Sequence, residues 1–121
     1  GIKNIKLPVS APFHCKLMKN ATAVMKTELE KINFEDSNKS LISNVTANEI
    51  NNKDDLKKLL VEQIESRVRW RESIIYMIEK GIDHFIEIGP GKVLSGLIKR
   101  INKSVKINTI NNETDIKDLK I

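Results

Sequence analysis

Apolar residues recur at intervals of three and four positions in several stretches of the chain, which is the spacing of amphipathic helices. This pattern predicts helices at about 15–32, 54–65, 70–80 and 92–102. The first of them carries a stripe made of Leu17, Ala21, Val24, Met25, Leu29 and Ile32. The third places Trp70, Ile74, Met77 and Ile78 on its inner face. Each predicted helix therefore has one side that needs a packing partner.

Short runs rich in β-branched residues lie between these helices and predict strands at about 41–45, 84–88 and 105–110. Strands that alternate with helices indicate an α/β fold with parallel pairing. The last two strands should be parallel neighbours, because the helix at 92–102 has to cross over between them. Residues 2–9 are expected to form a short extended segment, and residues 114–121 a polar tail with up to one helical turn.

Two helix ends carry residues that favour caps. Asn52 stands where the second helix begins, and Asp55 places a negative charge in its first turn. Gly81 follows the third helix at the C′ position, where glycine is preferred. These signals predict where the two helices begin and end.

Composition narrows the class of protein. With 40% hydrophobic and 31% charged residues, the chain has the balance of an ordinary globular protein. Its longest apolar run, Ile74 to Ile78, is far shorter than the ~20 residues that cross a bilayer, so no membrane partner is expected. The net charge is +5, but 17 of the 21 basic residues are lysine and only 4% of residues are aromatic. That pattern argues against nucleic acid as a partner and is compatible with an acidic protein partner.

The cysteine content argues against an internal disulfide and a cysteine metal site. Cys15 is the single cysteine, so it can form no internal disulfide, and it belongs to no cluster that would hold a metal. No metal site is expected, and a reducing compartment is indicated. The sequence leaves the choice between a plastid and the cytoplasm open.

A stiff segment from Leu7 to Cys15 carries the first candidate for chemistry, His14. Pro8 and Pro12 fix φ and remove two backbone donors, so this segment should be extended and not helical. His14 then lies where a loop meets a helix, a position from which an imidazole can project into a cleft. The alternative is a surface or capping histidine.

Gln63 is a polar residue on an otherwise apolar face, which it shares with Leu56, Leu59, Leu60 and Ile64. Burying an amide without a partner costs about 1–3 kcal/mol, so Gln63 should have a specific contact. One possibility is that its amide reaches water at the edge of the core. The other is that its side chain or its backbone carbonyl forms a hydrogen bond with a ring nitrogen of a histidine. The second arrangement would fix the tautomer of the imidazole without adding a charge.

A glycine-rich turn, Gly89-Pro90-Gly91-Lys92, separates the strand at 84–88 from the next helix. Such a turn can present amide groups to an anion, but Val93 stands where a nucleotide P-loop needs serine or threonine. The simpler interpretation is a tight turn that lets the helix pack on its strand. His84 shows no partner in the pattern and is assigned a structural role. Because the sequence contains no G-x-S-x-G nucleophile elbow, the residues alone provide a base and an orienting amide without a nucleophile.

Taken together, three stretches strongly resemble the malonyl-CoA:acyl carrier protein transacylases of type II fatty acid synthesis. They are Leu7 to Met18, Ile88 to Leu97, and Val68-Arg69-Trp70 downstream of Gln63. The similarity runs in order over essentially the whole span from Lys6 to Asn112. The resemblance implies that His14 is the catalytic histidine and that Gln63 positions it in place of an aspartate.

The resemblance also implies an architecture. The fold would be α/β, a partial α/β-hydrolase-like large subdomain at about 10–113, entered through a return segment at 1–9 from a small ferredoxin-like subdomain. The tail at 114–121 would follow it, and 1–121 would form the C-terminal segment of the acyltransferase domain. The family's serine nucleophile, its malonyl-binding arginine and an oxyanion-hole glutamine would lie upstream of Gly1, so the chain alone is expected to be inactive.

The implied reaction is ping-pong transfer of malonyl from malonyl-CoA to the phosphopantetheine of an acyl carrier protein, through a serine ester and without a cofactor. The implied partners are that carrier protein and the N-terminal part of the same enzyme. Two alternatives stay open at this point. The chain could come from an acyltransferase domain of a multidomain polyketide or fatty acid synthase, or it could be a non-catalytic module that only binds a carrier protein or another acidic partner.

Overall fold

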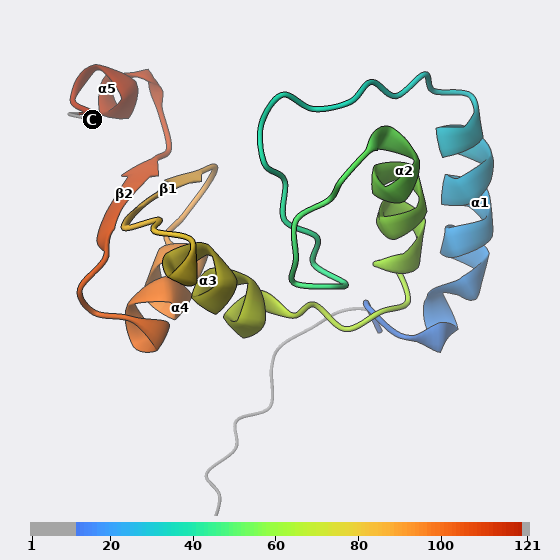
Figure 1. The fold of residues 1–121 in the computed structure, drawn as a ribbon, viewed down its shortest axis with the longest axis horizontal. Coiled ribbons are helices and arrows are strands. Elements are labelled where there is room, and N and C mark those ends of the chain that lie inside the picture. The colour runs from blue at the N-terminus through green and yellow to red at the C-terminus, as the bar shows by residue number, and fades with distance from the viewer. Residues whose placement is uncertain (1–11, 120–121) are drawn as a thin grey trace, which may run out of the picture. The chain divides into compact units, whose positions relative to one another are not determined.

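The computed structural model describes residues 12–119, which divide into two compact units, one up to Arg69 and one from Trp70 onwards (Figure 1). The first unit contains the 3₁₀ helix η1 (Lys16–Met18) and the helices α1 (Lys19–Glu30) and α2 (Lys53–Glu62). The second contains α3 (Trp70–Glu79), β1 (His84–Ile88), α4 (Val93–Ile101), β2 (Lys106–Ile110) and α5 (Glu113–Lys117). All four helices predicted from periodicity are present. The segment predicted at 2–9 lies outside the described residues.

The two strands of the second unit pair in parallel, with His84 opposite Lys106 and Ile88 opposite Ile110. Helix α4 makes the crossover between them, as parallel pairing requires (Figure 1). The prediction of parallel neighbours is confirmed.

The core of the second unit forms where α3 and α4 meet one face of this small sheet. Its buried members are Ile74, Phe85, Ile98 and Val105, and the partly buried residues packed against them are Trp70, Met77, Ile78, Ile101 and Ile107. Full burial of such a side chain stabilises the folded state by roughly 1.5–3 kcal/mol. The inner face predicted for the third helix is confirmed, because all four of its residues belong to this cluster.

Both predicted caps are present. The Asn52 side chain accepts a hydrogen bond from the backbone N–H of Asp55, at 2.9 Å, and so caps the start of α2. At the end of α3, the backbone N–H groups of Gly81 and Ile82 donate to the carbonyls of Ile78 and Met77, at 2.9 and 3.0 Å. This is the Schellman pattern, and Gly81 has the positive φ of 90° that it requires.

The predicted strand at 41–45 is wrong. Ile42 forms only an isolated antiparallel bridge with Glu49, and the chain turns directly afterwards. The Ser43 hydroxyl accepts hydrogen bonds from the backbone N–H groups of Val45 and Thr46, at 3.1 and 3.4 Å. A serine side chain that takes up the next backbone donors competes with strand pairing and favours a turn.

The first and last helices differ in detail from the prediction. The first turn after Cys15 is 3₁₀, and the α-helix begins only at Lys19. At the other end, the polar tail contains the short helix α5. Asn112 and Asp115 form a reciprocal capping box at its start, with each side chain accepting from the other residue's backbone N–H.

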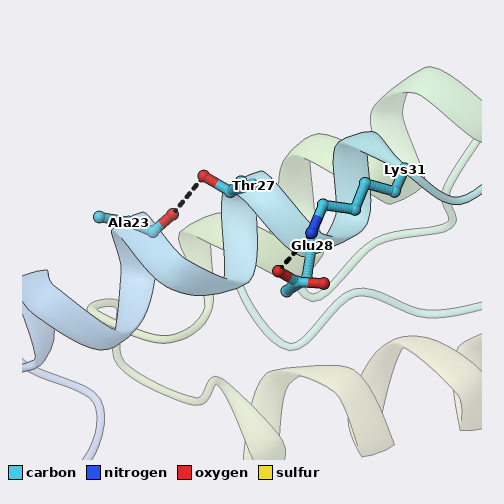
Figure 2. Close-up of polar contacts among 4 residues, drawn as sticks. All are labelled: Ala23, Thr27, Glu28 and Lys31. Atoms are coloured by element: carbon cyan, nitrogen blue, oxygen red, sulfur yellow. Dashed lines mark hydrogen bonds and ion pairs between the residues drawn. The ribbon is translucent and has the colours of Figure 1, made fainter.

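Helix α1 lies beside α2 in the first unit but buries none of its own residues (Figure 1). In its apolar stripe, Val24 is 65% and Met25 is 44% exposed. Figure 2 shows contacts along this helix: the Thr27 hydroxyl donates to the Ala23 carbonyl at 3.2 Å, and Lys31 pairs with Glu28 at 2.7 Å. An exposed ion pair such as Lys31–Glu28 contributes less than about 1 kcal/mol. In the stripe itself, Leu29 is half-buried while Val24 and Met25 stay exposed. None of the helices in residues 12–119 has the length and apolar character needed to cross a membrane.

Candidate active site

His14 lies in the turn that precedes η1, and its backbone adopts the left-handed region with φ of 59°. Few residues other than glycine take this conformation, although histidine is among those enriched in it. The segment from Pro12 to Cys15 is not helical, as predicted, but it forms a turn at Phe13 and His14 and is not extended. The rest of the predicted segment, up to residue 11, lies outside the described residues. His14 itself is exposed, so the ring is reachable from outside the first unit.

The His14 ring contacts the C-terminal end of α2. Its Nδ1 atom lies 2.8 Å from the backbone carbonyl oxygen of Gln63, which occupies the C-cap position of that helix. The last carbonyl groups of a helix lack partners within the helix, so this oxygen is well suited to accept from a side chain. The predicted contact between His14 and Gln63 is confirmed, and the atom that makes it is the carbonyl oxygen.

This geometry fixes the tautomer of the neutral ring. A carbonyl oxygen can only accept, so Nδ1 must carry the proton and donate it. The lone pair is then on Nε2, which is the nitrogen able to take a proton from a nucleophile. Nε2 takes no part in the contact with Gln63, which is the arrangement that a base oriented by a neutral acceptor would require.

The side chain of Gln63 has a different partner, which the sequence did not indicate. Its Oε1 atom accepts a hydrogen bond from Nδ2 of Asn44, at 3.3 Å, across 19 positions of sequence. Asn44 falls inside the segment that was expected to be a strand. Because that segment forms a turn, the Asn44 side-chain amide reaches Gln63 at the end of α2. No local sequence pattern predicts this contact.

Comparison with known proteins identifies the family of the chain. No family model matches the chain. It is 48% identical over 102 residues to a malonyl CoA-acyl carrier protein transacylase of Bacillus subtilis, and 41% identical over 118 residues to that of Staphylococcus aureus. By sequence and by fold, the chain belongs to this transacylase family.

Solved structures of the transacylase family agree with the sequence relatives. An acyl-carrier-protein S-malonyltransferase from Bartonella henselae superposes with a TM-score of 0.86 at 42% identity, over 93% of this chain and 36% of its own. A malonyl-transacylase solved in complex with a type II polyketide acyl-carrier protein gives a TM-score of 0.84 at 34% identity, over 92% of this chain and 36% of its own. The α/β fold class predicted from the sequence is confirmed.

The match covers most of the chain but only part of each relative. It includes 84% of this chain and 32% of the B. subtilis transacylase, and 97% of this chain and 38% of the S. aureus transacylase. The chain thus spans about a third of the length of the curated relatives it matches.

The glycine-rich turn of the second unit is not an open anion site. Glu87 on β1 places its carboxylate at the N-terminus of α4, where it accepts from the backbone N–H groups of Leu94 and Ser95 at 3.0 and 2.7 Å. The Ser95 hydroxyl donates to the same carboxylate, and this bond is the largest of the effects that lower the pKa of Glu87. The tight-turn interpretation is supported, since the chain's own carboxylate already occupies the helix terminus.

His84 does have a partner. Its Nε2 atom lies 2.8 Å from Oδ1 of Asn108 on the neighbouring strand, so this contact bridges β1 and β2. The sequence pattern did not indicate this partner. The structural role assigned to His84 agrees with the contact. Among residues 12–119 there is no group of three or more His, Cys, Asp and Glu side chains that could hold a metal ion.

Proposed function

We propose that this chain supplies the histidine-bearing, C-terminal part of an acyl carrier protein S-malonyltransferase. The whole enzyme would transfer malonyl from malonyl-CoA to the phosphopantetheine thiol of an acyl carrier protein through a serine ester. The observation that carries this proposal is the 2.8 Å contact between His14 Nδ1 and the Gln63 carbonyl, which leaves Nε2 as the proton acceptor.

In the first half-reaction, His14 Nε2 takes the proton of the serine hydroxyl as the serine oxygen attacks the malonyl thioester. The proton then passes from Nε2 to the sulfur of coenzyme A as the carbon–sulfur bond breaks. In the second half-reaction the same nitrogen takes the proton of the phosphopantetheine thiol and returns it to the serine oxygen. Each proton has a carrier within the protein, so these steps require no metal or redox cofactor.

The neutral acceptor suits this task. A carbonyl oxygen orients the imidazole but stabilises imidazolium less than a buried carboxylate would. His14 can therefore release its proton readily to a leaving thiolate. The serine, the arginine for the malonyl carboxylate and the oxyanion-hole donors would come from the other two thirds of the transacylase.

Two observations support a carrier protein as the acceptor. One solved relative is a malonyl-transacylase in complex with its acyl-carrier protein. The chain also has a net charge of +5, which favours encounter with an acidic partner through electrostatic steering.

A chimera tests the proposal. The aligned part of the B. subtilis transacylase is replaced by the matching residues of this chain, and malonyl transfer to a holo-acyl carrier protein is measured. The chimera should be active, and His14→Ala should lower kcat by about 10²- to 10⁴-fold, the usual contribution of general acid–base catalysis. His84→Ala is the matched control and should retain most of the activity, because His84 contacts Asn108 and lies in the other unit.

Two results would contradict the proposal. A His14→Ala chimera with undiminished kcat would show that His14 is not the base. A folded chimera that binds the carrier protein without transferring malonyl would favour the non-catalytic binding module.

A further inference from the structure

Gln63 makes two contacts in different directions. Its carbonyl oxygen accepts from His14 at 2.8 Å, and its side-chain Oε1 accepts from Asn44 at 3.3 Å. The backbone of this turn is closed by hydrogen bonds from Gln63 to Leu59 at 3.0 Å and from Ile64 to Val61 at 3.3 Å. The side-chain contact with Asn44 adds a restraint on Gln63 that comes from outside the helix end.

Asn44 contacts both ends of the segment that follows α2. Its side chain bonds to Gln63, and its backbone carbonyl accepts from the Arg69 N–H at 2.9 Å. The Arg69 side chain donates in addition to the Thr46 carbonyl, at 3.0 Å. Asn44 thus connects the beginning and the end of the stretch between Gln63 and Arg69.

The loop around Asn44 is built to be rigid. Ser43 and Asn48 bond across it through their backbones at 2.9 Å, and the Ala47 N–H donates to the Ser43 carbonyl, also at 2.9 Å. Ser43 and Ala47 are each only 5% exposed, and Ala47 has a positive φ of 57°. A strained residue persists only where its surroundings determine its conformation, and such residues concentrate at functional sites.

We infer that Asn44 is a positioning residue for His14. It fixes the side chain of Gln63, so that the Gln63 carbonyl keeps the direction in which it receives Nδ1–H and holds Nε2 as the acceptor. This role rests on the proposed function for its catalytic consequence, but the effect on the His14 ring is a property of the chain itself.

The tautomer of His14 gives a direct test in the chain alone. Two-bond ¹H–¹⁵N correlation spectra, recorded where the imidazole is neutral, measure the ratio of the Nδ1–H to the Nε2–H form. Asn44→Ala should shift this ratio towards Nε2–H by about two- to tenfold, the range that the loss of one neutral hydrogen bond supports. Asn48→Ala is the matched control, since its amide donates to the Thr46 carbonyl in the same loop and should leave the ratio unchanged.

A second variant covers the case in which Asn44→Ala does not fold. Gln63→Ala keeps the backbone carbonyl and the loop but removes the atom that Asn44 holds. It should produce a shift of the same size. The double variant should shift the ratio no further than either single change, because both remove the same contact.

The chimera with the B. subtilis transacylase measures the catalytic consequence. Asn44→Ala should lower kcat by about two- to tenfold with little change in KM for malonyl-CoA, because Asn44 acts through Gln63 and not on the substrate. If both the tautomer ratio and kcat stay at their original values while the melting temperature falls, Asn44 is only a structural residue and the inference is overturned. An inactive original chimera would instead overturn the proposed function, and the tautomer ratio would still decide the role of Asn44.

Discussion

At the scale of single residues, two side chains form hydrogen bonds with backbone groups at helix ends, which have no partners within their helices. His14 donates to the Gln63 carbonyl at the C-terminal end of α2, and the Glu87 carboxylate accepts from Leu94 and Ser95 at the N-terminal end of α4. Helix termini carry partial charges, positive at the N-terminus and negative at the C-terminus, and each side chain matches the sign it meets. The same physical rule thus accounts for the orientation of the His14 ring in one unit and for a helix cap in the other.

The pH dependence of stability follows from Glu87. Its pKa is lowered below the usual value of 4.5, first by the Ser95 hydroxyl and then by the Ser95 and Leu94 N–H groups, against an opposing effect of burial. The unfolded chain therefore binds this proton more tightly, and the cap contributes stability that is complete above pH 4.5 and is lost as the pH falls through the lowered pKa. Glu87→Gln should lower the free energy of unfolding at neutral pH, and the two curves should converge under acid conditions.

Urea unfolding followed by the fluorescence of Trp70, the only tryptophan, reports on the unit that contains Glu87. Glu79→Gln, at the exposed end of α3, is the control and should show no such convergence. A deficit in Glu87→Gln that stays constant from about pH 7 to about pH 3 would mean that the charge of Glu87 has no part in the cap.

At the scale of elements, the helix ends determine where the chain changes direction. Asn52 starts α2 by accepting from the Asp55 N–H, and Gly81 ends α3 in a left-handed conformation that sends the chain into β1. These caps are local, since each involves residues within a few positions of one another. They fix where α2 begins and where α3 ends.

Two glycines allow a matched test of this argument. A Cβ atom at Gly81 or at Gly96 would meet no atom within 4 Å, so the same substitution is free of clashes at both. Gly81 has φ of 90°, where alanine is strained, whereas Gly96 lies inside α4. Gly81→Ala should destabilise the second unit by about 1–2 kcal/mol, and Gly96→Ala should stabilise it by up to about 1 kcal/mol. Urea unfolding should therefore show effects of opposite sign, and equal signs would refute the conformational explanation.

At the scale of the whole molecule, the transacylase reaction is proposed for an assembly larger than this chain. His14 Nδ1 contacts the Gln63 carbonyl oxygen, while Ser43 and Ser95 are buried and engaged in local hydrogen bonds. The chain also matches only 32% of the length of its B. subtilis relative. Activity is therefore expected from the assembled transacylase and not from this chain by itself.

Mass spectrometry can test that expectation. After incubation with malonyl-CoA, the isolated chain should carry no stoichiometric malonyl ester on serine, because its sequence has no nucleophile elbow. The active chimera should carry one malonyl group per molecule under the same conditions. A stoichiometric serine ester on the isolated chain would show that the nucleophile has been wrongly placed outside it.

Features that depend on neighbours along the chain could be predicted from the order of the residues. The helices, the Asn52 and Gly81 caps and the parallel pairing of β1 with β2 all follow from spacing, turn chemistry and the need for a crossover. The polar position of Gln63 on an apolar face also showed that it needed a partner, and the motif around His14 suggested which one.

The identity of the contacting atoms followed only from the fold. His14 contacts the carbonyl of Gln63 and not its side chain, across 49 positions, and Asn44 comes from a segment whose strand-like composition was misleading. The Glu87 carboxylate at the N-terminus of α4 was likewise not predicted. Such contacts depend on the directions in which distant backbone groups point, and those directions are set by the packing of whole elements. A local pattern records that a polar group needs a partner, but the partner's identity is a property of the folded chain.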